Sequence, residues 1–199
     1  MVTGICGGIG SGKSVVSRLL RLRGYDVYDC DMEARGIMAS SREIREAMEN
    51  RWPAMDIYAG GEMDRAKVAA IVFADAAERA WLDSMVHGRV REHLAAWIAA
   101  RSGERVFVES AILFSSGLWQ MCNDVWEVTA PEDLRIRRIM TRSGMDAAQA
   151  ADRIGVQRGE ETHSARRNVT IHNIVNDGLH SLLREVELAQ KKENKISTK

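Results

Sequence analysis

The sequence predicts an α/β protein with a parallel sheet flanked by helices, a helical insertion subdomain and a small lid. The first observation is the order strand, glycine-rich loop, helix, strand at the start of the chain. The second is that strand-like runs disappear between residues 40 and 103, where Ala, Met, Glu and Arg dominate. The third is the return of strand patterns from Arg105 onward. Because a strand–helix–strand unit joins parallel strands, these observations favour a parallel sheet interrupted by one helical segment.

Composition and charge disfavour several classes of protein. The 199 residues are 45% hydrophobic and 28 basic side chains balance 28 acidic ones, so neither global disorder nor a dedicated duplex-DNA binder is expected. No apolar run approaches the roughly 20 residues that a membrane-spanning helix needs. The chain starts without a cationic leader, and three cysteines are an odd number for a disulfide framework. We therefore expect a cytoplasmic protein without nucleic-acid or membrane partners. No long heptad pattern points to an oligomer, and a monomer or weak homo-oligomer is expected.

The elements at the start of the chain follow in order. Val2–Cys6 is short and β-permissive, and apolar residues then recur at helical spacing from Val15 to Leu22. Gly24 is placed to end this helix, because glycine is common just beyond a helix C-terminus. Tyr25–Tyr28 is the predicted second strand, which completes a βαβ unit.

The middle of the chain predicts several helices, since its apolar residues recur mostly three or four apart from Ile44 to Ile98. The later elements are predicted as strands at Arg105–Glu109, Val125–Thr129 and Val169–Val175, and as helices at Pro131–Thr141, after an Asp146–Gln149 capping box, and at Leu179–Gln190. We interpret residues 1–199 as one domain. Its core comprises 1–39, 104–141 and 168–199, its helical insertion 40–103 and its lid 142–167.

The segment 7–14, Gly-Gly-Ile-Gly-Ser-Gly-Lys-Ser, satisfies the pattern G-x-x-x-x-G-K-[ST]. A loop that wraps phosphates must turn its backbone N–H groups inward, which glycine allows at little cost. The helix that begins near Lys13 adds its positive N-terminal end. Lys13 can reach the β- and γ-phosphates, and the Ser14 hydroxyl can ligate Mg²⁺. Because the loop follows a strand and opens a helix, we expect a bound nucleoside triphosphate; the alternative is a glycine-rich turn without a ligand.

Asp29 and Asp31 flank Cys30 at the expected carboxyl end of the second strand, the edge at which open parallel sheets collect ligands. Residues two apart on a strand project to the same side, so both carboxylates are expected to face the phosphate loop. A carboxylate there can accept the proton of an acceptor hydroxyl, as in kinases. The alternatives are a solvated turn or a helix N-cap, since Asp is favoured at both.

The choice among P-loop proteins rests on what accompanies the loop. The guanine-binding pattern N-K-x-D is absent, and the chain is short for a large ATPase, for which Glu109 is the only strand-end acidic candidate. The order of small chain, helical insertion and arginine-rich helix is that of small-molecule kinases. The arginine-rich region contains six arginines: Arg135, Arg137, Arg138, Arg142, Arg153 and Arg158. Most of them are expected on a solvated face, paired with Glu132, Asp133 and Asp152. Some are expected to close on the transferring phosphoryl group.

Several motifs, in this order, resemble the dephospho-CoA kinase family. The loop 7–14 and the triplet Asp29-Cys30-Asp31 with Ala34-Arg35 match the start of that family, whose loop reads TGGIGSGKS and whose second strand ends in D-A-D. The later matches are Trp81-Leu82 to His87 (a helix ending in L-H-P), Ser110–Phe114 with Gly117-Leu118, Ala130–Glu132 with Arg142–Gly144, and Ile171-His172-Asn173 (an I-D-N strand end). The resemblance covers about residues 2–176.

This resemblance implies a P-loop kinase-like fold and transfer of the γ-phosphoryl group of ATP to the ribose 3′-hydroxyl of dephospho-CoA, the last step of coenzyme A synthesis, with Mg²⁺. It implies Asp31 as general base, with Lys13 and Arg142 as further catalytic residues, and a helical insertion that binds the acceptor. Asp29, Arg35 and His87 are candidate acceptor-binding residues, although a His between apolar helical residues is more often a core or capping group. The implied ATP-binding residues are Gly7, Gly8, Gly10, Ser11, Gly12, Lys13, Ser14 and Val15.

Four positions depart from the family pattern. Gly88 and Ala111 stand where the family has proline, Ser115 where Glu is usual, and His172 where Asp is usual. The phosphate-binding motif is intact. Two alternative functions stay open: another small nucleoside or nucleotide kinase, and a nucleotide-binding regulatory module.

Overall fold

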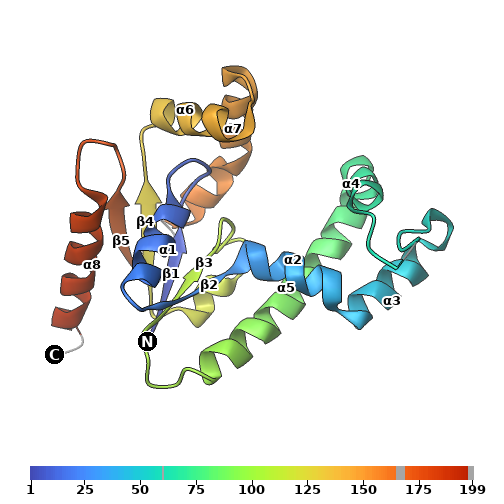
Figure 1. Ribbon diagram of the computed structural model, residues 1–199, viewed down its shortest axis with the longest axis horizontal. Coiled ribbons are helices and arrows are strands. Elements are labelled where there is room, and N and C mark those ends of the chain that lie inside the picture. The colour runs from blue at the N-terminus through green and yellow to red at the C-terminus, as the bar shows by residue number, and fades with distance from the viewer. Residues whose placement is uncertain (60, 165–168, 197–199) are drawn as a thin grey trace. The chain divides into compact units, whose positions relative to one another are not determined.

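Figure 1 shows the computed structural model of the chain, which describes residues 1–59, 61–164 and 169–196. The chain divides into two compact units, Met1–Asp29 with Arg101–Lys199, and Cys30–Ala100. The second unit contains helices and no strand among its described residues. It begins at Cys30, earlier than the expected boundary at residue 40, because the helix that follows the second strand packs with the helices of this unit.

A five-stranded sheet forms the centre of the first unit, with the order β2-β3-β1-β4-β5 and every neighbouring pair parallel. The strands are β1 (Val2–Cys6), β2 (Asp26–Asp29), β3 (Val106–Glu109), β4 (Asp124–Thr129) and β5 (Thr170–Val175). The predicted parallel sheet is therefore confirmed. Since parallel strands share one carboxyl edge, the segments that follow β1, β2, β3 and β4 all leave the sheet on the side where ligands usually bind.

The core of this unit lies between the sheet and two helices, α1 (Lys13–Leu22) and α8 (Leu182–Ile196) (Figure 1). The rings of Phe107 and Trp126 meet edge to face, with centroids 5.2 Å apart. Val16 and Leu20 of α1 are fully buried in the same cluster. Burying a side chain of this size contributes about 1.5–3 kcal/mol. The helix that follows the phosphate loop is thus anchored to the sheet by its apolar face.

Helix α1 ends at the glycine predicted to stop it. Gly24 has φ +85°, its N–H donates to the Arg21 carbonyl, and the N–H of Tyr25 donates to the Leu20 carbonyl. These two bonds are those of a Schellman motif, in which a left-handed residue just beyond the helix lets the last carbonyls be satisfied.

Two helices follow β4, namely α6 (Glu132–Ser143) and α7 (Ala147–Ser164). The predicted capping box is confirmed, because the Gln149 N–H donates to Asp146 Oδ1 at 2.8 Å and the Asp146 N–H donates to Gln149 Oε1 at 3.2 Å. The end of the predicted lid, residues 165–167, lies outside the described residues. The two helices share a small buried cluster, against which Ile9 of the phosphate loop also packs: Ile139, Ala150 and Ile154.

The closing helix α8 starts at Leu182, later than the predicted start at Leu179. Asp177 accounts for the difference, since its Oδ1 accepts hydrogen bonds from the backbone N–H groups of Leu179 and His180, both at 2.9 Å. These bonds form a turn that competes with helix formation over the same residues.

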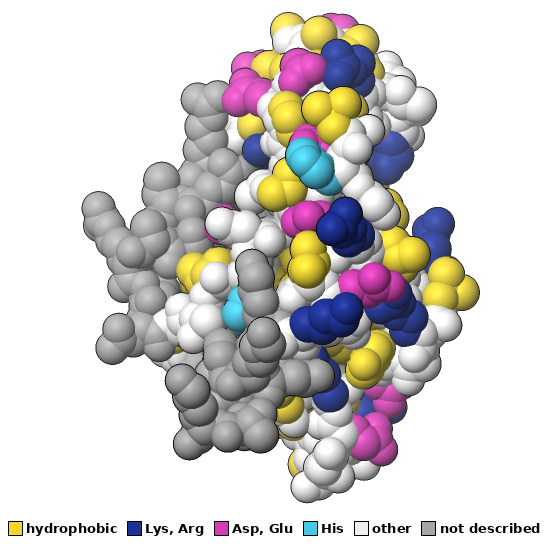
Figure 2. Space-filling model, turned by 90° about the vertical axis from the view of Figure 1, so that its left-hand side faces the viewer, with side chains coloured by type: hydrophobic (Ala, Val, Ile, Leu, Met, Phe, Trp, Pro, Cys, Tyr) yellow, Lys and Arg dark blue, Asp and Glu magenta, His cyan; other side chains and the backbone are white. Residues whose placement is uncertain are grey.

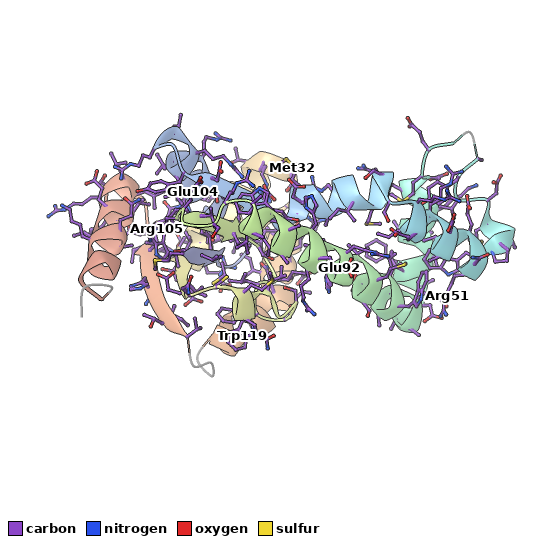
Figure 3. The ribbon with its side chains drawn as sticks, turned by 90° about the horizontal axis from the view of Figure 1, so that it is seen from below. Met32, Arg51, Glu92, Glu104, Arg105 and Trp119 are labelled. Carbon is purple, nitrogen blue, oxygen red and sulfur yellow. The ribbon has the colours of Figure 1, made fainter. Side chains whose placement is uncertain are left out.

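The second unit consists of α2 (Cys30–Ser40), α3 (Arg42–Arg51), the 3₁₀ turn η1 (Pro53–Met55), α4 (Arg65–Ala74) and α5 (Ala76–Ala99). Asp64 and Asp75 cap α4 and α5 through their side-chain oxygens. Arg51, labelled in Figure 3, donates from Nε and Nη2 to Glu78 at 2.8 and 3.0 Å, and its guanidinium lies 5.0 Å from the Trp81 ring centroid. This contact ties the end of α3 to the start of α5.

The helix end expected after His87, from the resemblance to the family's L-H-P turn, is wrong for this chain. Helix α5 continues through His87 and Gly88 to Ala99. The reason is the residue at 88, because glycine keeps the backbone N–H that proline lacks, so the intrahelical hydrogen bond persists. Val86 and Val90 are buried on either side of the glycine and hold the helix to its unit.

No helix in the described part of the chain is long and apolar enough to cross a membrane. On the face seen in Figure 2, basic, acidic and hydrophobic side chains are interspersed, in keeping with a net charge of zero.

A short 3₁₀ turn, η2 (Leu118–Met121), precedes β4 and completes the described elements of the first unit.

Candidate active site

The phosphate loop, residues 7–14, connects β1 to α1 as predicted. Two of its glycines are required by backbone conformation and by space. Gly12 has φ +100° and Gly10 has φ +79°, values that other residues rarely adopt. A Cβ atom at Gly10 would also lie 2.8 Å from the Arg135 carbonyl oxygen. The loop therefore keeps its shape only with glycine at these positions.

The N-terminus of α1 presents positive charge at this loop. Gly12 is the N-cap, and the first intrahelical bonds run from the N–H groups of Val15 and Val16 to the Gly12 carbonyl, at 3.0 and 3.2 Å. The amides before them have no intrahelical acceptor, and no acidic side chain lies in the first turn. Lys13 Nζ lies over the start of the loop and donates to the Gly7 carbonyl at 2.6 Å. These donors and this charge suit a bound phosphate chain.

Helix α6 supports the loop from outside through Arg135 and Arg138, two of the six arginines considered from the sequence. Arg135 is buried, and its Nε donates to the Ile9 carbonyl at 2.9 Å. Arg137, on the exposed face, forms the expected surface pair with Asp133 at 2.9 Å. The expectation of a solvated face is thus confirmed for Arg137 and wrong for Arg135, because α6 packs its inner face directly against the loop. The side chain of Arg158 lies outside those that the structure describes.

Arg138 and Asn176 form a second, connected support. Arg138 Nη1 donates to the carbonyls of Gly10 and Ser11 at 3.2 and 3.3 Å. Asn176, directly after β5, donates from Nδ2 to the same Ser11 carbonyl at 2.7 Å. Arg138 Nη2 in turn donates to the Asn176 carbonyl and to its Oδ1, at 3.2 and 3.1 Å. Sequence reasoning missed Asn176, whose only signal was a polar residue at the carboxyl end of a predicted strand.

Helix α7 reaches the loop from another side. The Ile9 N–H donates to Gln157 Oε1 at 2.5 Å, and Gln157 Nε2 donates to the Ala111 carbonyl at 3.4 Å. One amide side chain thus bridges the phosphate loop and the segment after β3. Nothing in the spacing of the sequence pointed to Gln157.

Glu109 is the buried acidic residue of the site. It ends β3, lies opposite Asp29 in the β2–β3 pairing, and is 9% exposed. Burial raises the pKa of Glu109, and the charge of Asp29 raises it further, whereas the Ser17 hydroxyl, Lys13 and Arg21 oppose the shift. Glu109 therefore lies within electrostatic reach of Lys13. It was weighed from the sequence only as the strand-end residue of an ATPase.

The expectation that Asp29 and Asp31 project from one strand is wrong. Strand β2 ends at Asp29 and α2 begins at Cys30, so Asp31 lies exposed in the first turn of a helix. The strand alternation does not extend past Asp29, because the chain changes to helical dihedral angles at the next residue. Asp29 belongs to the first unit and Asp31 to the second. The role of Asp31 toward the phosphate loop stays a prediction.

The remaining predicted residues lie on helices. Arg142 is exposed in the last turn of α6. Arg35 is exposed on α2, and His87 is partly buried on α5, both in the second unit. Their predicted roles, on the phosphoryl group for Arg142 and on the acceptor for Arg35 and His87, stay predictions.

The strand end expected at Ile171-His172-Asn173 lies elsewhere. These residues are inside β5, where His172 pairs with Trp126 and Asn173 with Glu127. The strand ends at Val175, so the Ile174-Val175-Asn176 triplet occupies the place assigned to the family's I-D-N pattern. His172 faces Asp124 instead, with Nε2 3.6 Å from Oδ2. The similar letters in I-H-N misled the assignment, since a triplet alone does not fix where a strand ends.

Comparison with known proteins agrees with this arrangement. The family model described as dephospho-CoA kinase matches residues 1–178. The dephospho-CoA kinase of Porphyromonas gingivalis is 35% identical over 187 residues, covering 94% of this chain and 91% of the relative. That of Deinococcus radiodurans is also 35% identical, over 193 residues, covering 93% of this chain and 92% of the relative.

Solved structures show the same fold. TT1252 from Thermus thermophilus superposes with a TM-score of 0.78 at 32% identity, covering 98% of this chain and 96% of that one. Dephospho-CoA kinase from Campylobacter jejuni gives 0.70 at 20% identity, with 98% of both chains covered. The family model spans β1 through the segment that carries Asn176, and relatives above 30% identity span most of both chains, so this chain belongs to the dephospho-CoA kinase family.

Proposed function

We propose that this chain transfers the γ-phosphoryl group of ATP to the ribose 3′-hydroxyl of dephospho-CoA, giving ADP and coenzyme A. The observation that carries the proposal is the complete phosphate loop between β1 and α1, in a chain that belongs to the dephospho-CoA kinase family. The proposed ATP-binding set is the loop and the start of α1: Gly7, Gly8, Gly10, Ser11, Gly12, Lys13, Ser14 and Val15.

Lys13 stabilises the phosphates in this proposal. Its ammonium group is held near the loop by the carbonyls of Gly7 and Gly8, at 2.6 and 3.3 Å. Charge builds up on the β- and γ-phosphate oxygens as the phosphoryl group transfers, and a fixed cation and fixed backbone amides stabilise that charge without reorganising.

Asp31 serves as the general base. It accepts the proton of the acceptor hydroxyl while the hydroxyl oxygen forms a bond to the γ-phosphorus. The bond from the γ-phosphorus to the bridging oxygen breaks, and its electron pair leaves with ADP. The position of Asp31 in the first turn of α2, directly after a strand that ends at the ligand-binding edge, supports this role. Asp29, Arg35 and His87 are the proposed acceptor contacts.

Mg²⁺ fits the donors beside the loop. Ser14 supplies an exposed hydroxyl, and Glu109 supplies a carboxyl group at the end of β3. The described part of the chain holds no group of three or more His, Cys, Asp or Glu side chains able to bind a metal by themselves. This suits Mg²⁺, which is usually held by one or two protein ligands together with substrate phosphates. When bound, the ion neutralises phosphate charge.

The test is acceptor-dependent turnover. Incubation of the purified chain with ATP, Mg²⁺ and dephospho-CoA is expected to produce ADP and coenzyme A in equal amounts. Turnover with a nucleoside or nucleotide and not with dephospho-CoA would indicate a different small-molecule kinase. Background hydrolysis alone, whatever the acceptor, would indicate a regulatory module. Lys13→Ala is the matched control, since it is expected to lose most turnover while the chain stays folded.

A further inference from the structure

The outside of the phosphate loop carries a feature that its sequence motif does not encode. Three successive carbonyls, of Ile9, Gly10 and Ser11, all accept hydrogen bonds from side chains of α6 or from Asn176. The donors come from segments more than a hundred residues further along the chain. All of them lie in the first unit.

We propose that Arg138 and Asn176 are positioning residues that fix the peptide planes of the phosphate loop in the orientation that binds ATP. The inference rests on the proposed function, because it assumes that the loop holds the triphosphate. It adds two residues, one on α6 and one after β5, that act on the nucleotide through the loop and not through direct contact.

The planarity of the peptide bond links the orientation of each loop carbonyl to that of the next N–H group. In a trans peptide the carbonyl and the N–H of the following residue point in opposite directions. The Ser11 carbonyl is held by Asn176 Nδ2 at 2.7 Å and by Arg138 Nη1 at 3.3 Å. The Gly12 N–H therefore points away from both side chains. If the peptide between Ser11 and Gly12 rotated, the Gly12 N–H would no longer be presented as a donor at the N-terminus of α1.

The preceding peptide is held at both of its ends. The Gly10 carbonyl accepts from Arg138 Nη1 at 3.2 Å, and the Ser11 N–H donates to the Gly8 carbonyl at 3.1 Å. Glycine-rich backbone has many accessible conformations and loses the most entropy when it is ordered. Hydrogen bonds from a guanidinium to neutral carbonyls are stronger than neutral ones. The hydrogen bonds from Arg138 therefore order a loop backbone that its glycines leave free to adopt many conformations.

Arg138 is suited to this task by the shape of its guanidinium. One nitrogen spans the carbonyls of Gly10 and Ser11, and the other is fixed by Asn176 through two bonds. A lysine has a single point charge on a flexible stem and cannot make this planar fork. Asn176 carries no charge, so an effect of its substitution on ATP binding cannot come from a direct charge on the phosphates.

The experiment compares MgATP affinity by titration calorimetry with steady-state constants for both substrates. Arg138→Ala is expected to weaken MgATP binding about tenfold to a hundredfold and to leave the KM for dephospho-CoA unchanged. Arg138→Lys is expected to bind MgATP nearly as weakly as Arg138→Ala, because lysine lacks the planar fork. Asn176→Ala removes the donor to the Ser11 carbonyl without adding a charge, so it is expected to weaken MgATP binding about threefold to tenfold. Arg137→Ala, on the exposed face of the same helix, is the control.

Three results would overturn the proposal. The first is full MgATP affinity in Arg138→Lys, which would show that charge alone matters. The second is wild-type MgATP affinity in Asn176→Ala. The third is a lower melting temperature with unchanged ATP constants, which would show a purely structural role. The double variant Arg138→Ala with Asn176→Ala is expected to be less affected than the two single effects combined, because both residues hold one carbonyl. Failure of the wild-type chain to bind MgATP would overturn the proposed function itself.

Discussion

Substitution of Gly12 by alanine tests how tightly the phosphate loop is constrained. Gly12 is the N-cap of α1, with φ +100° and ψ 23°. A Cβ atom at this position would overlap the Asn176 side-chain amide, with the next contact at Arg138 Nη1, 3.9 Å away. The amide cannot yield without losing its 2.7 Å hydrogen bond to the Ser11 carbonyl. The variant therefore imposes a backbone cost and breaks one contact of the loop.

The backbone strain and the lost Asn176 hydrogen bond each have a typical cost in free energy. A left-handed conformation costs an L-residue about 1–2 kcal/mol. Loss of a neutral hydrogen bond costs about 0.5–1.5 kcal/mol. If the loop keeps its shape, the free energy of unfolding falls by roughly 1.5–3.5 kcal/mol. If the loop shifts to relieve the strain, MgATP affinity falls by about tenfold to a few hundredfold.

Gly24→Ala separates the backbone cost of a left-handed alanine from the loss of the loop contact. Gly24 also has a positive φ, +85°, but a Cβ there would meet nothing within 4 Å. It therefore carries the backbone cost alone and lies away from the loop. Both variants change the entropy of the unfolded chain equally, so that effect cancels in the comparison.

The assay is urea unfolding together with MgATP titration of both variants. Gly12→Ala is expected to lose ATP affinity and Gly24→Ala is not. Removing the obstructing amide with Asn176→Ala is expected to make Gly12→Ala less harmful than it is in the wild-type background. Equal unfolding midpoints and wild-type ATP affinity in Gly12→Ala and Gly24→Ala would refute the reasoning, because neither strain nor crowding would then be present.

Three further substitutions test the proposed roles of acidic and basic residues. Asp31→Asn is expected to keep MgATP binding while kcat falls roughly 10²–10⁴-fold, as for loss of a general base; unchanged turnover would direct attention to Asp29. Arg142→Ala is expected to lower kcat more than MgATP affinity, and the reverse pattern in steady-state and binding data would contradict a role in phosphoryl transfer. Glu109→Gln is expected to flatten the dependence of stability on pH. Because burial raises the pKa of Glu109, its proton is bound more tightly in the folded chain. The contribution of Glu109 to stability is therefore fully present below the ordinary carboxyl range and is lost as pH rises through the raised pKa. Urea unfolding of the nucleotide-free chain across this range measures the difference, and parallel curves for wild type and variant would contradict the assignment.

Local patterns predicted most of the fold. The period of apolar residues placed the five strands of the sheet. Glycine at 24 and the pair Asp146 and Gln149 marked helix boundaries, which a Schellman motif and a capping box confirm. The errors arose where a pattern was extended past its element. Asp31 was assigned to a strand that ends at Asp29, and Leu179 to a helix that a turn at Asp177 delays.

Part of the candidate site was likewise predictable from the sequence and part was not. The phosphate loop was identified from the sequence because its chemistry is contiguous, with backbone amides, a lysine and a hydroxyl within eight residues. The side chains that hold this loop were not identified, because they come from elsewhere in the chain. Arg138 lies 128 residues from Gly10 in sequence, and Asn176 lies 165 residues from Ser11.

The sequence alone determined that a loop with the phosphate-binding motif joins a strand to a helix in a kinase-like chain, since each of those features depends on neighbouring residues. Only the tertiary structure decided which arginines meet the loop and which face solvent. It also decided that Asn176 reaches Ser11 and that Glu109 is buried beside Asp29. The physical reason is that helix period and strand alternation fix which face a residue occupies, whereas the packing of distant segments fixes what that face meets.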